Sequence, residues 1–131
     1  MRMAGDVGVS RRSSQSRRRA LAECRDRLEK KVSVMIMPEG TRSTDGELLP
    51  FRDGAFELAI ATGCPILPLA LVGTRDAMPK GSFVFNRTVA EVRVLEPIET
   101  TGLTVADVPE LRDRTRATIA EAKRKLMTRA Q

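Results

Sequence analysis

The clearest pattern in the chain is a short run of apolar residues over 32–37, Val32-Ser33-Val34-Met35-Ile36-Met37. The run carries no charge and is rich in β-branched residues, which is typical of a strand buried on both faces. Pro38 ends it, because proline cannot continue a ladder of hydrogen bonds. A second run of the same kind covers 66–72, so the pattern predicts two buried strands.

A loop and a helix are expected between these strands. The loop covers 43–50, with Asp45-Gly46 as its turn. Asp53 or Gly54 can begin a helix that reaches Thr62, and Gly63 can end it. Strand, loop, helix and strand in about forty residues have the size of a βαβ unit. Such a unit pairs its strands in parallel through a right-handed crossover.

Weaker patterns predict the remaining elements. Ser13 or Ser16 can cap a helix that runs to about Lys30, and its apolar stripe consists of Ala20, Leu21, Cys24 and Leu28. A more exposed strand is expected over 89–95, and a last helix over about 108–127. The apolar face of that last helix carries Leu111, Thr115, Ile119, Ala122 and Leu126. Together these elements predict an α/β fold with a mostly parallel sheet flanked by helices.

Composition limits the class of protein. A length of 131 residues suits one domain. Two cysteines make no disulfide framework, which favours a reducing, cytoplasmic compartment. Residues 1–20 contain no apolar segment typical of a secretory signal. The longest uncharged run, 58–74, contains Gly63, Pro65 and Pro68 and is slightly short for a bilayer span, so any membrane contact is expected to be peripheral.

The net charge of +6 lies in one segment. Residues 1–31 hold ten Lys and Arg against four Asp and Glu, whereas residues 32–131 hold thirteen of each. Such a segment can face phosphate groups or anionic lipid. Tyr and Trp are absent and no nucleic-acid-binding motif accompanies the charge, so we expect no nucleic-acid partner. A basic nucleic-acid-binding domain that uses residues 2–31 remains an alternative.

The chain contains no histidine. This excludes a Ser-His-Asp triad, a Cys-His pair and a histidine-ligated metal site within these residues. We therefore expect neither a metal nor a cofactor. Asp53 is interpreted as a helix N-cap rather than a catalytic acid, and Lys123 with its basic neighbours as charge that suits a helix C-terminus.

The segment after the first predicted strand has the residues of a phosphate site. Gly40 allows close backbone approach or a positive φ, and Thr41 offers a hydroxyl. Arg42 offers a planar fork of donors that matches a phosphate. Glu39 can hold Arg42 or meet a substrate hydroxyl. The plainer interpretation is a surface ion pair between Glu39 and Arg42, worth at most about 1 kcal/mol.

The same segment carries a family resemblance. Pro38-Glu39-Gly40-Thr41-Arg42-Ser43 resembles the third motif of the lysophosphatidic acid acyltransferase (1-acyl-sn-glycerol-3-phosphate acyltransferase) family. Residues 63–74, with paired prolines and a following glycine, resemble the fourth motif, and 48–56 resemble the stretch between them. Residues 5–11 resemble the second motif. The resemblance covers residues 3–100 of one partial domain that spans 1–131.

The resemblance implies a fold, a reaction and a site. The fold is that of the glycerolipid acyltransferases, and the reaction transfers an acyl group from acyl-CoA or acyl-carrier protein to a lysophosphatidate-like acceptor in phospholipid biosynthesis. Glu39, Gly40, Thr41 and Arg42 are expected at the acceptor phosphate, with Arg11 as a second phosphate contact. Residues 65–73 are expected to shape the acyl-side wall. The enzyme is expected in the cytoplasm, peripheral at the inner membrane face.

One family feature is missing. The first motif of the family is a histidine, four residues and an aspartate, and the histidine acts as general base on the acceptor hydroxyl. General-base help is worth about a hundred- to ten-thousand-fold in rate. We therefore assign no catalytic residue and expect this chain alone to be inactive, through a misassigned start or a truncated gene. A fold incomplete at its N-terminal side is expected to self-associate. The alternative is a non-catalytic module that binds lipid phosphate.

Overall fold

The computed structural model describes residue 7, residues 13–77 and residues 83–129. The helices in these residues are α1 (Ser14–Glu29), α2 (Gly54–Thr62), α3 (Thr74–Ala77) and α4 (Val108–Arg129), with the 3₁₀ turn η1 (Val105–Asp107) before α4. The strands are β1 (Leu69–Val72) and β2 (Glu91–Val94). Arg11 lies outside the described residues, as does the second-motif segment except Val7.

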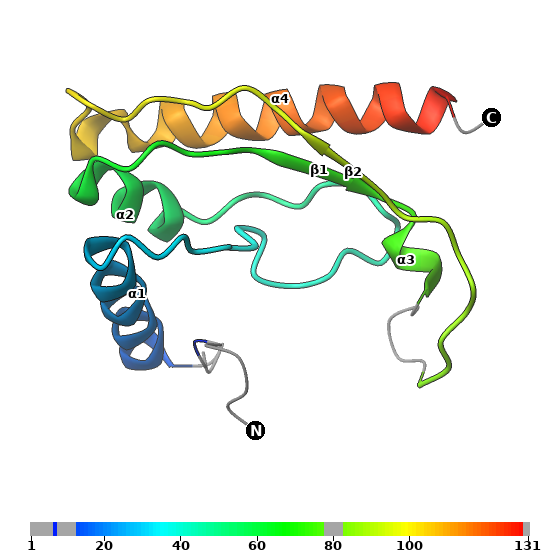
Figure 1. Cartoon of the computed structure of the whole chain (residues 1–131), viewed down its shortest axis with the longest axis horizontal. Helices are drawn as coiled ribbons and strands as arrows, with labels where there is room; N and C mark the ends of the chain where they lie inside the picture. The colour runs from blue at the N-terminus through cyan, green and yellow to red at the C-terminus, as the bar shows by residue number, and fades with distance from the viewer. Residues whose placement is uncertain (1–6, 8–12, 78–82, 130–131) are drawn as a thin grey trace.

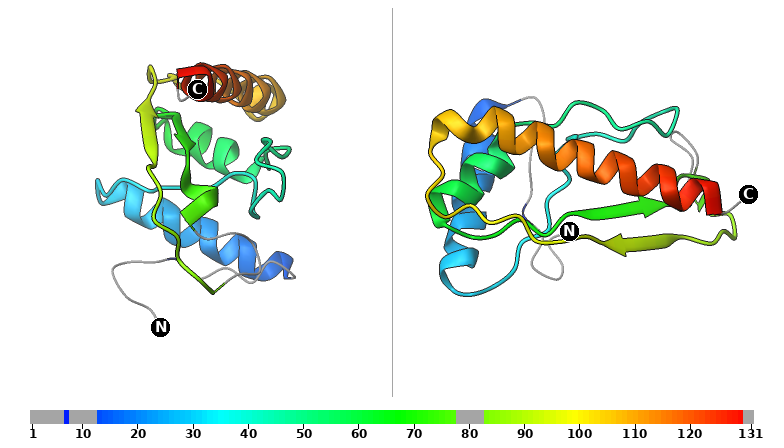
Figure 2. Two further views of the ribbon diagram at one scale, coloured as in Figure 1. Left: turned by 90° about the vertical axis from the view of Figure 1, so that its right-hand side faces the viewer. Right: turned by 90° about the horizontal axis from the view of Figure 1, so that it is seen from above.

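The longest helix, α4, runs along the strand pair (Figure 1) and packs against β1. Helices α1 and α2 pack together at one end of the molecule, and α3 lies at the other end, directly after β1. Seen from above, α4 runs beside the strand pair, and β1 lies between α4 and β2 (Figure 2). The architecture is therefore a helical layer on a small sheet, with a helical pair at one side.

The two strands are antiparallel. Leu69 pairs with Val94 and Val72 pairs with Glu91, and an isolated bridge between Ile66 and Ile98 extends the alignment. The prediction of a mostly parallel sheet is therefore wrong for the part of the chain that the structure describes, although its mixture of helices and strands is confirmed. The reason is partner choice: β1 takes the later strand β2 as its neighbour instead of the segment that precedes α2.

The predicted buried strand over 32–37 is not formed. This segment is extended but belongs to no ladder among the described residues, and its side chains are largely exposed: Met35 is 65% and Met37 is 63% exposed. A strand needs a hydrogen-bonding partner as well as an apolar sequence, and none of the described segments pairs with this one. The part of the chain that the structure describes therefore contains no parallel βαβ crossover.

The helix ends follow the local sequence signals, with one exception. The Ser16 N–H donates to Ser13 Oγ at 3.2 Å, which confirms Ser13 as the cap of α1. Gly63 has a φ of 65° and ends α2 as predicted. Asp53 is not a side-chain cap, because its backbone is already helical (φ −68°, ψ −29°); its Oδ1 instead accepts from Arg112 Nη1 at 2.8 Å.

Two apolar clusters form the core. The first joins α2 and the residue segments before α2 and after β2 to the start of α4, through Phe51, Phe56, Ile98, Val108 and Leu111. The second joins β1 to the end of α4 through Ala70, Ala122 and Leu126. Every member of the predicted α4 stripe is buried or half-buried, so the interpretation of that stripe as core packing is confirmed. None of the helices in the described residues has the length and apolar character to cross a membrane.

Candidate functional site

The predicted phosphate site lies on a turn that the backbone closes from both sides. The Gly40 N–H donates to the Met37 carbonyl at 3.1 Å, and the Arg52 N–H donates to the Pro38 carbonyl at 2.9 Å. The second bond brings the residues before α2 back against the turn. Residues 38–41 are therefore fixed by hydrogen bonds, although no sheet holds the segment that precedes them.

Gly40 supplies conformation to this turn. Its φ is 69°, in the left-handed region that favours glycine. Because its N–H is engaged by Met37, the residue contributes its backbone geometry rather than a donor. The expectation of a positive φ at Gly40 is confirmed.

Glu39 is held by the loop that follows. Its Oε2 accepts from the Leu49 N–H at 2.8 Å, and the side chain is half-buried. A charge-assisted bond of this kind is roughly twice as strong as a neutral one. The carboxylate therefore connects the turn to residues 48–49, a role that the sequence pattern did not predict.

Thr41 and Arg42 complete the site on the exposed side of the turn. Thr41 follows Gly40 directly and Arg42 follows Thr41, and both residues are exposed. The four contiguous candidates thus share one turn, two of them held inward and two at the surface. The fifth candidate, Arg11, lies outside the described residues.

The loop after the turn is ordered by its own side chains. Ser43 Oγ donates to Asp45 Oδ1 at 2.6 Å and accepts from the Gly46 N–H at 3.0 Å, while the Glu47 N–H donates to Asp45 Oδ1 at 3.0 Å. The Ser43 hydroxyl and then the Glu47 N–H hold the pKa of Asp45 below its ordinary value, because both bonds favour the carboxylate. Gly46 has a φ of 88°, which confirms the predicted turn.

Three distant cations bind the carbonyl oxygens of this loop. Arg116 of α4 donates from Nε to Leu49 at 3.1 Å and from Nη2 to Leu48 at 2.5 Å. Lys123 donates to Gly46 at 2.9 Å, and Arg75 donates to Asp45 at 2.7 Å. Lys123 therefore does more than favour a helix C-terminus. The sequence offered one signal for these contacts: the seven-residue spacing of Arg116 and Lys123 places both on one helix face.

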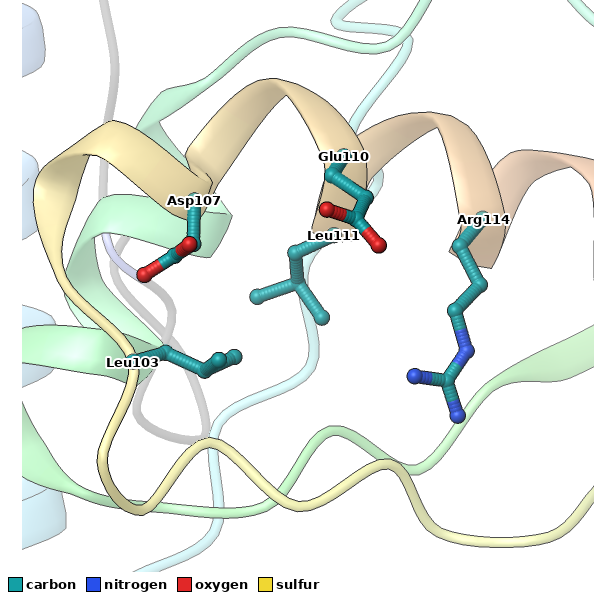
Figure 3. A pocket seen from close by; sticks show the side chains of 5 residues that line it. All are labelled: Leu103, Asp107, Glu110, Leu111 and Arg114. Carbon is teal, nitrogen blue, oxygen red and sulfur yellow. The ribbon is translucent and has the colours of Figure 1, made fainter.

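The hollows described in the structure lie elsewhere. One, of about 70 Å³, is lined by Leu103, Asp107, Glu110, Leu111 and Arg114 at the start of α4 (Figure 3). Its Asp107 accepts from the Thr104 N–H at 2.6 Å, which lowers the pKa of that carboxyl and caps the helical turn. Another, of about 370 Å³, lies between α1 and α2. Residues 39–42 line neither of these two hollows.

No cluster of three or more potential metal-binding side chains is present among the described residues. The site therefore consists of one turn with a guanidinium, a hydroxyl and a carboxylate. That donor set can bind an anion such as a phosphate ester without a metal.

Comparison with known proteins gives consistent results. The model of the Acyltransferase family matches residues 1–72. The human 1-acyl-sn-glycerol-3-phosphate acyltransferase alpha is 41% identical over 101 residues, which are 77% of this chain and 36% of the human protein. The chloroplastic 1-acyl-sn-glycerol-3-phosphate acyltransferase BAT2 of Brassica napus is 41% identical over 99 residues, 75% of this chain and 29% of that protein.

A solved structure is similar as well. The crystal structure of the 1-acyl-sn-glycerophosphate (LPA) acyltransferase PlsC from Thermotoga maritima superposes with a TM-score of 0.76 at 32% sequence identity. The match covers 83% of this chain and 44% of that one. The chain thus spans about a third of the length of these curated relatives and less than half of the solved one.

Proposed function

Because the chain belongs to the acyltransferase family, we propose that it serves the acylation of 1-acyl-glycerol-3-phosphate in phospholipid biosynthesis. The observation that carries this proposal is the turn over 38–42. Its residues resemble the third motif of the family. Within it, Gly40 is left-handed and the Glu39 carboxylate accepts a hydrogen bond from the following loop. Similarity to proteins named for this activity supports the same substrate class.

In this proposal the turn binds the phosphate of the acceptor. Arg42 presents a planar fork that can donate two parallel bonds to phosphate oxygens, and Thr41 adds a hydroxyl. Gly40 lets the backbone of the turn approach the phosphate closely, and Glu39 holds the turn in place through its hydrogen bond with the Leu49 N–H. With its phosphate bound, the acceptor can direct its free hydroxyl at the thioester carbonyl of the donor, so that the ester forms as the thiol leaves.

The proton of that hydroxyl needs a base. The family resemblance assigns it to a histidine, and these 131 residues contain none. We therefore propose that the described residues contribute acceptor binding, and we expect no acyl transfer from this chain alone. Acyl-CoA or acyl-carrier protein as donor, and a peripheral position at the inner membrane face, belong to the same proposal. The basic excess of residues 1–31 supports it, because such charge favours an anionic lipid surface.

Calorimetric titration with a short-chain lysophosphatidate, below its critical micelle concentration, tests the proposal. We expect saturable binding that Arg42→Ala weakens about tenfold to a hundredfold, because a charge-assisted hydrogen bond is worth roughly 1.5–3 kcal/mol. The matching monoacylglycerol, which lacks the phosphate, should bind weakly to both proteins.

Arg19→Ala is the matched control, because it removes the same charge from the exposed face of α1, where Arg19 pairs with Glu23. It should leave the affinity unchanged. Equal weakening by both variants would mean diffuse attraction to the basic chain, and salt-sensitive nucleic-acid binding that ignores Arg42→Ala would favour a different function. Acyl transfer by the purified chain would overturn the assignment of the base.

A further inference from the structure

We propose that Arg116 is a positioning residue for the turn over 38–42, acting through the backbone of residues 48–49. This inference rests on the proposed function for its ligand and on three hydrogen bonds for its geometry. Arg116 donates to the carbonyl oxygens of Leu48 and Leu49, and the Leu49 N–H donates to the Glu39 carboxylate. Three links thus join the middle of α4 to the turn.

The geometry of the guanidinium explains why one arginine can hold this segment. Its Nε and Nη2 donors point the same way from a planar fork, and here they reach two successive carbonyl oxygens at 3.1 and 2.5 Å. Two bonds to neighbouring peptide groups fix their orientation as well as their distance. The Leu49 N–H is thereby held in the direction that meets Glu39.

The other end of the tether is rigid. Thr115, the residue before Arg116, is 3% exposed, and its Oγ1 donates to the Leu111 carbonyl at 2.7 Å within α4. Leu111 belongs to the apolar cluster that also contains Phe51 and Phe56. Arg116 therefore projects from a part of α4 that the core holds in place. Motion of the loop is not expected to displace this part of the helix.

The other two cations hold a different part of the loop. Lys123 and Arg75 bind the carbonyl oxygens of Gly46 and Asp45, at the loop tip. Neither touches the peptide group that holds Glu39. Comparing Arg116 with Lys123 therefore separates positioning of the turn from general attachment of the loop to α4.

The first measurement is amide hydrogen exchange at Leu49, which requires no ligand. Arg116→Ala should raise the exchange rate of this N–H about tenfold, the factor that corresponds to one net hydrogen bond. Arg116→Lys should restore part of the protection, because an ammonium can reach one carbonyl but not two in a fixed plane. Lys123→Ala should change exchange near Gly46 and leave Leu49 protected.

The second measurement is affinity for short-chain lysophosphatidate. Arg116→Ala should weaken binding about fivefold to tenfold, and the effect should largely vanish in a Glu39→Ala background, because both residues act through one link. Lys125→Ala, which removes a charge that pairs with Glu121 on the same helix, should have no effect. Melting temperatures show whether each variant is folded, and Arg116→Lys serves if Arg116→Ala is not.

The outcomes are distinguishable. Unchanged Leu49 exchange in folded Arg116→Ala, or in Arg116→Lys where the alanine variant does not fold, overturns the tether. Increased exchange with unchanged affinity reduces Arg116 to a structural attachment and also overturns the inference. If the unaltered chain does not bind lysophosphatidate while Leu49 exchange still rises in the variant, the tether stands and the proposed function fails.

Discussion

Two glycines near the motifs are required for different reasons. At Gly40 an added Cβ would lie 2.7 Å from Nε of Arg52, a flexible side chain that can move, so the left-handed φ is the main constraint. At Gly73, directly after β1, an added Cβ would lie 2.1 Å from the Val89 carbonyl oxygen, which is backbone. Of these two glycines, Gly73 therefore combines a positive φ (81°) with the close approach of another segment's backbone.

Asp45 gives a pH-dependent prediction at the same scale. Its folded pKa lies below the ordinary 3.8, because the Ser43 hydroxyl and the Glu47 N–H favour the charged form. A depressed carboxyl pKa contributes stability that is present above the unfolded pKa and is lost as pH falls through the folded one. We expect the amide resonances of Gly46 and Glu47 to be constant above about pH 5 and to titrate with a midpoint below the ordinary Asp value.

The control for this titration is Asp45→Asn, which should abolish the step at both amides. A midpoint at or above the unfolded value would contradict the assigned hydrogen bonds.

The roles of single residues could be predicted in part: the roles of Gly40 and Gly46 follow from local backbone preferences. The partner of Glu39 did not follow, because any backbone N–H within reach could have met the carboxylate.

At the scale of elements, α4 both packs the core and binds the loop. One face buries Leu111, Ala122 and Leu126, and Arg116 and Lys123 reach the loop beside it. The apolar face was predictable because its three- and four-residue spacing is a property of the helix itself. The contacts of Arg116 and Lys123 were not predictable. A lysine or arginine gives the same sequence pattern whether its side chain is in solvent or donates to a carbonyl oxygen.

Leu126 tests the packing of α4 on the sheet. Its side chain is fully buried (0% exposed) beside Ala70, so Leu126→Ala should lower the free energy of unfolding by about 2–5 kcal/mol. Urea denaturation followed by circular dichroism measures the change. The neighbouring Met127 is 55% exposed, so Met127→Ala should change stability by about 0.5 kcal/mol or less. Similar losses in both variants would contradict this packing.

At the scale of the whole molecule, apolar side chains remain at the surface in several segments. Phe83 is 98% and Phe85 is 78% exposed, and the extended segment 32–37 adds four more large apolar side chains, Val32, Met35, Ile36 and Met37. Where exposed apolar side chains form one patch, they mark an interaction site or an aggregation risk. The antiparallel pair also has two open edges, since the described sheet contains only β1 and β2.

We therefore expect the purified chain to self-associate at micromolar concentration, which sedimentation velocity at several concentrations measures. Met35→Ser combined with Met37→Ser should shift the distribution toward monomer. Met127→Ser, which removes an exposed methionine from α4, should not. A monodisperse monomer at every concentration would contradict the expectation.

The sequence alone determined the local features of this protein: the approximate extents of α1, α2 and α4, Ser13 as one of two candidate caps, the special backbone expected at Gly40, Gly46 and Gly63, and the motif that leads to its family. These depend on residues within one or two turns of each other, so a linear pattern contains them. Strand pairing and the attachment of the loop to α4 were decided only by the tertiary structure. Both use backbone carbonyl and N–H groups, which every residue carries alike, so the choice among them depends on which segments the packed core brings together.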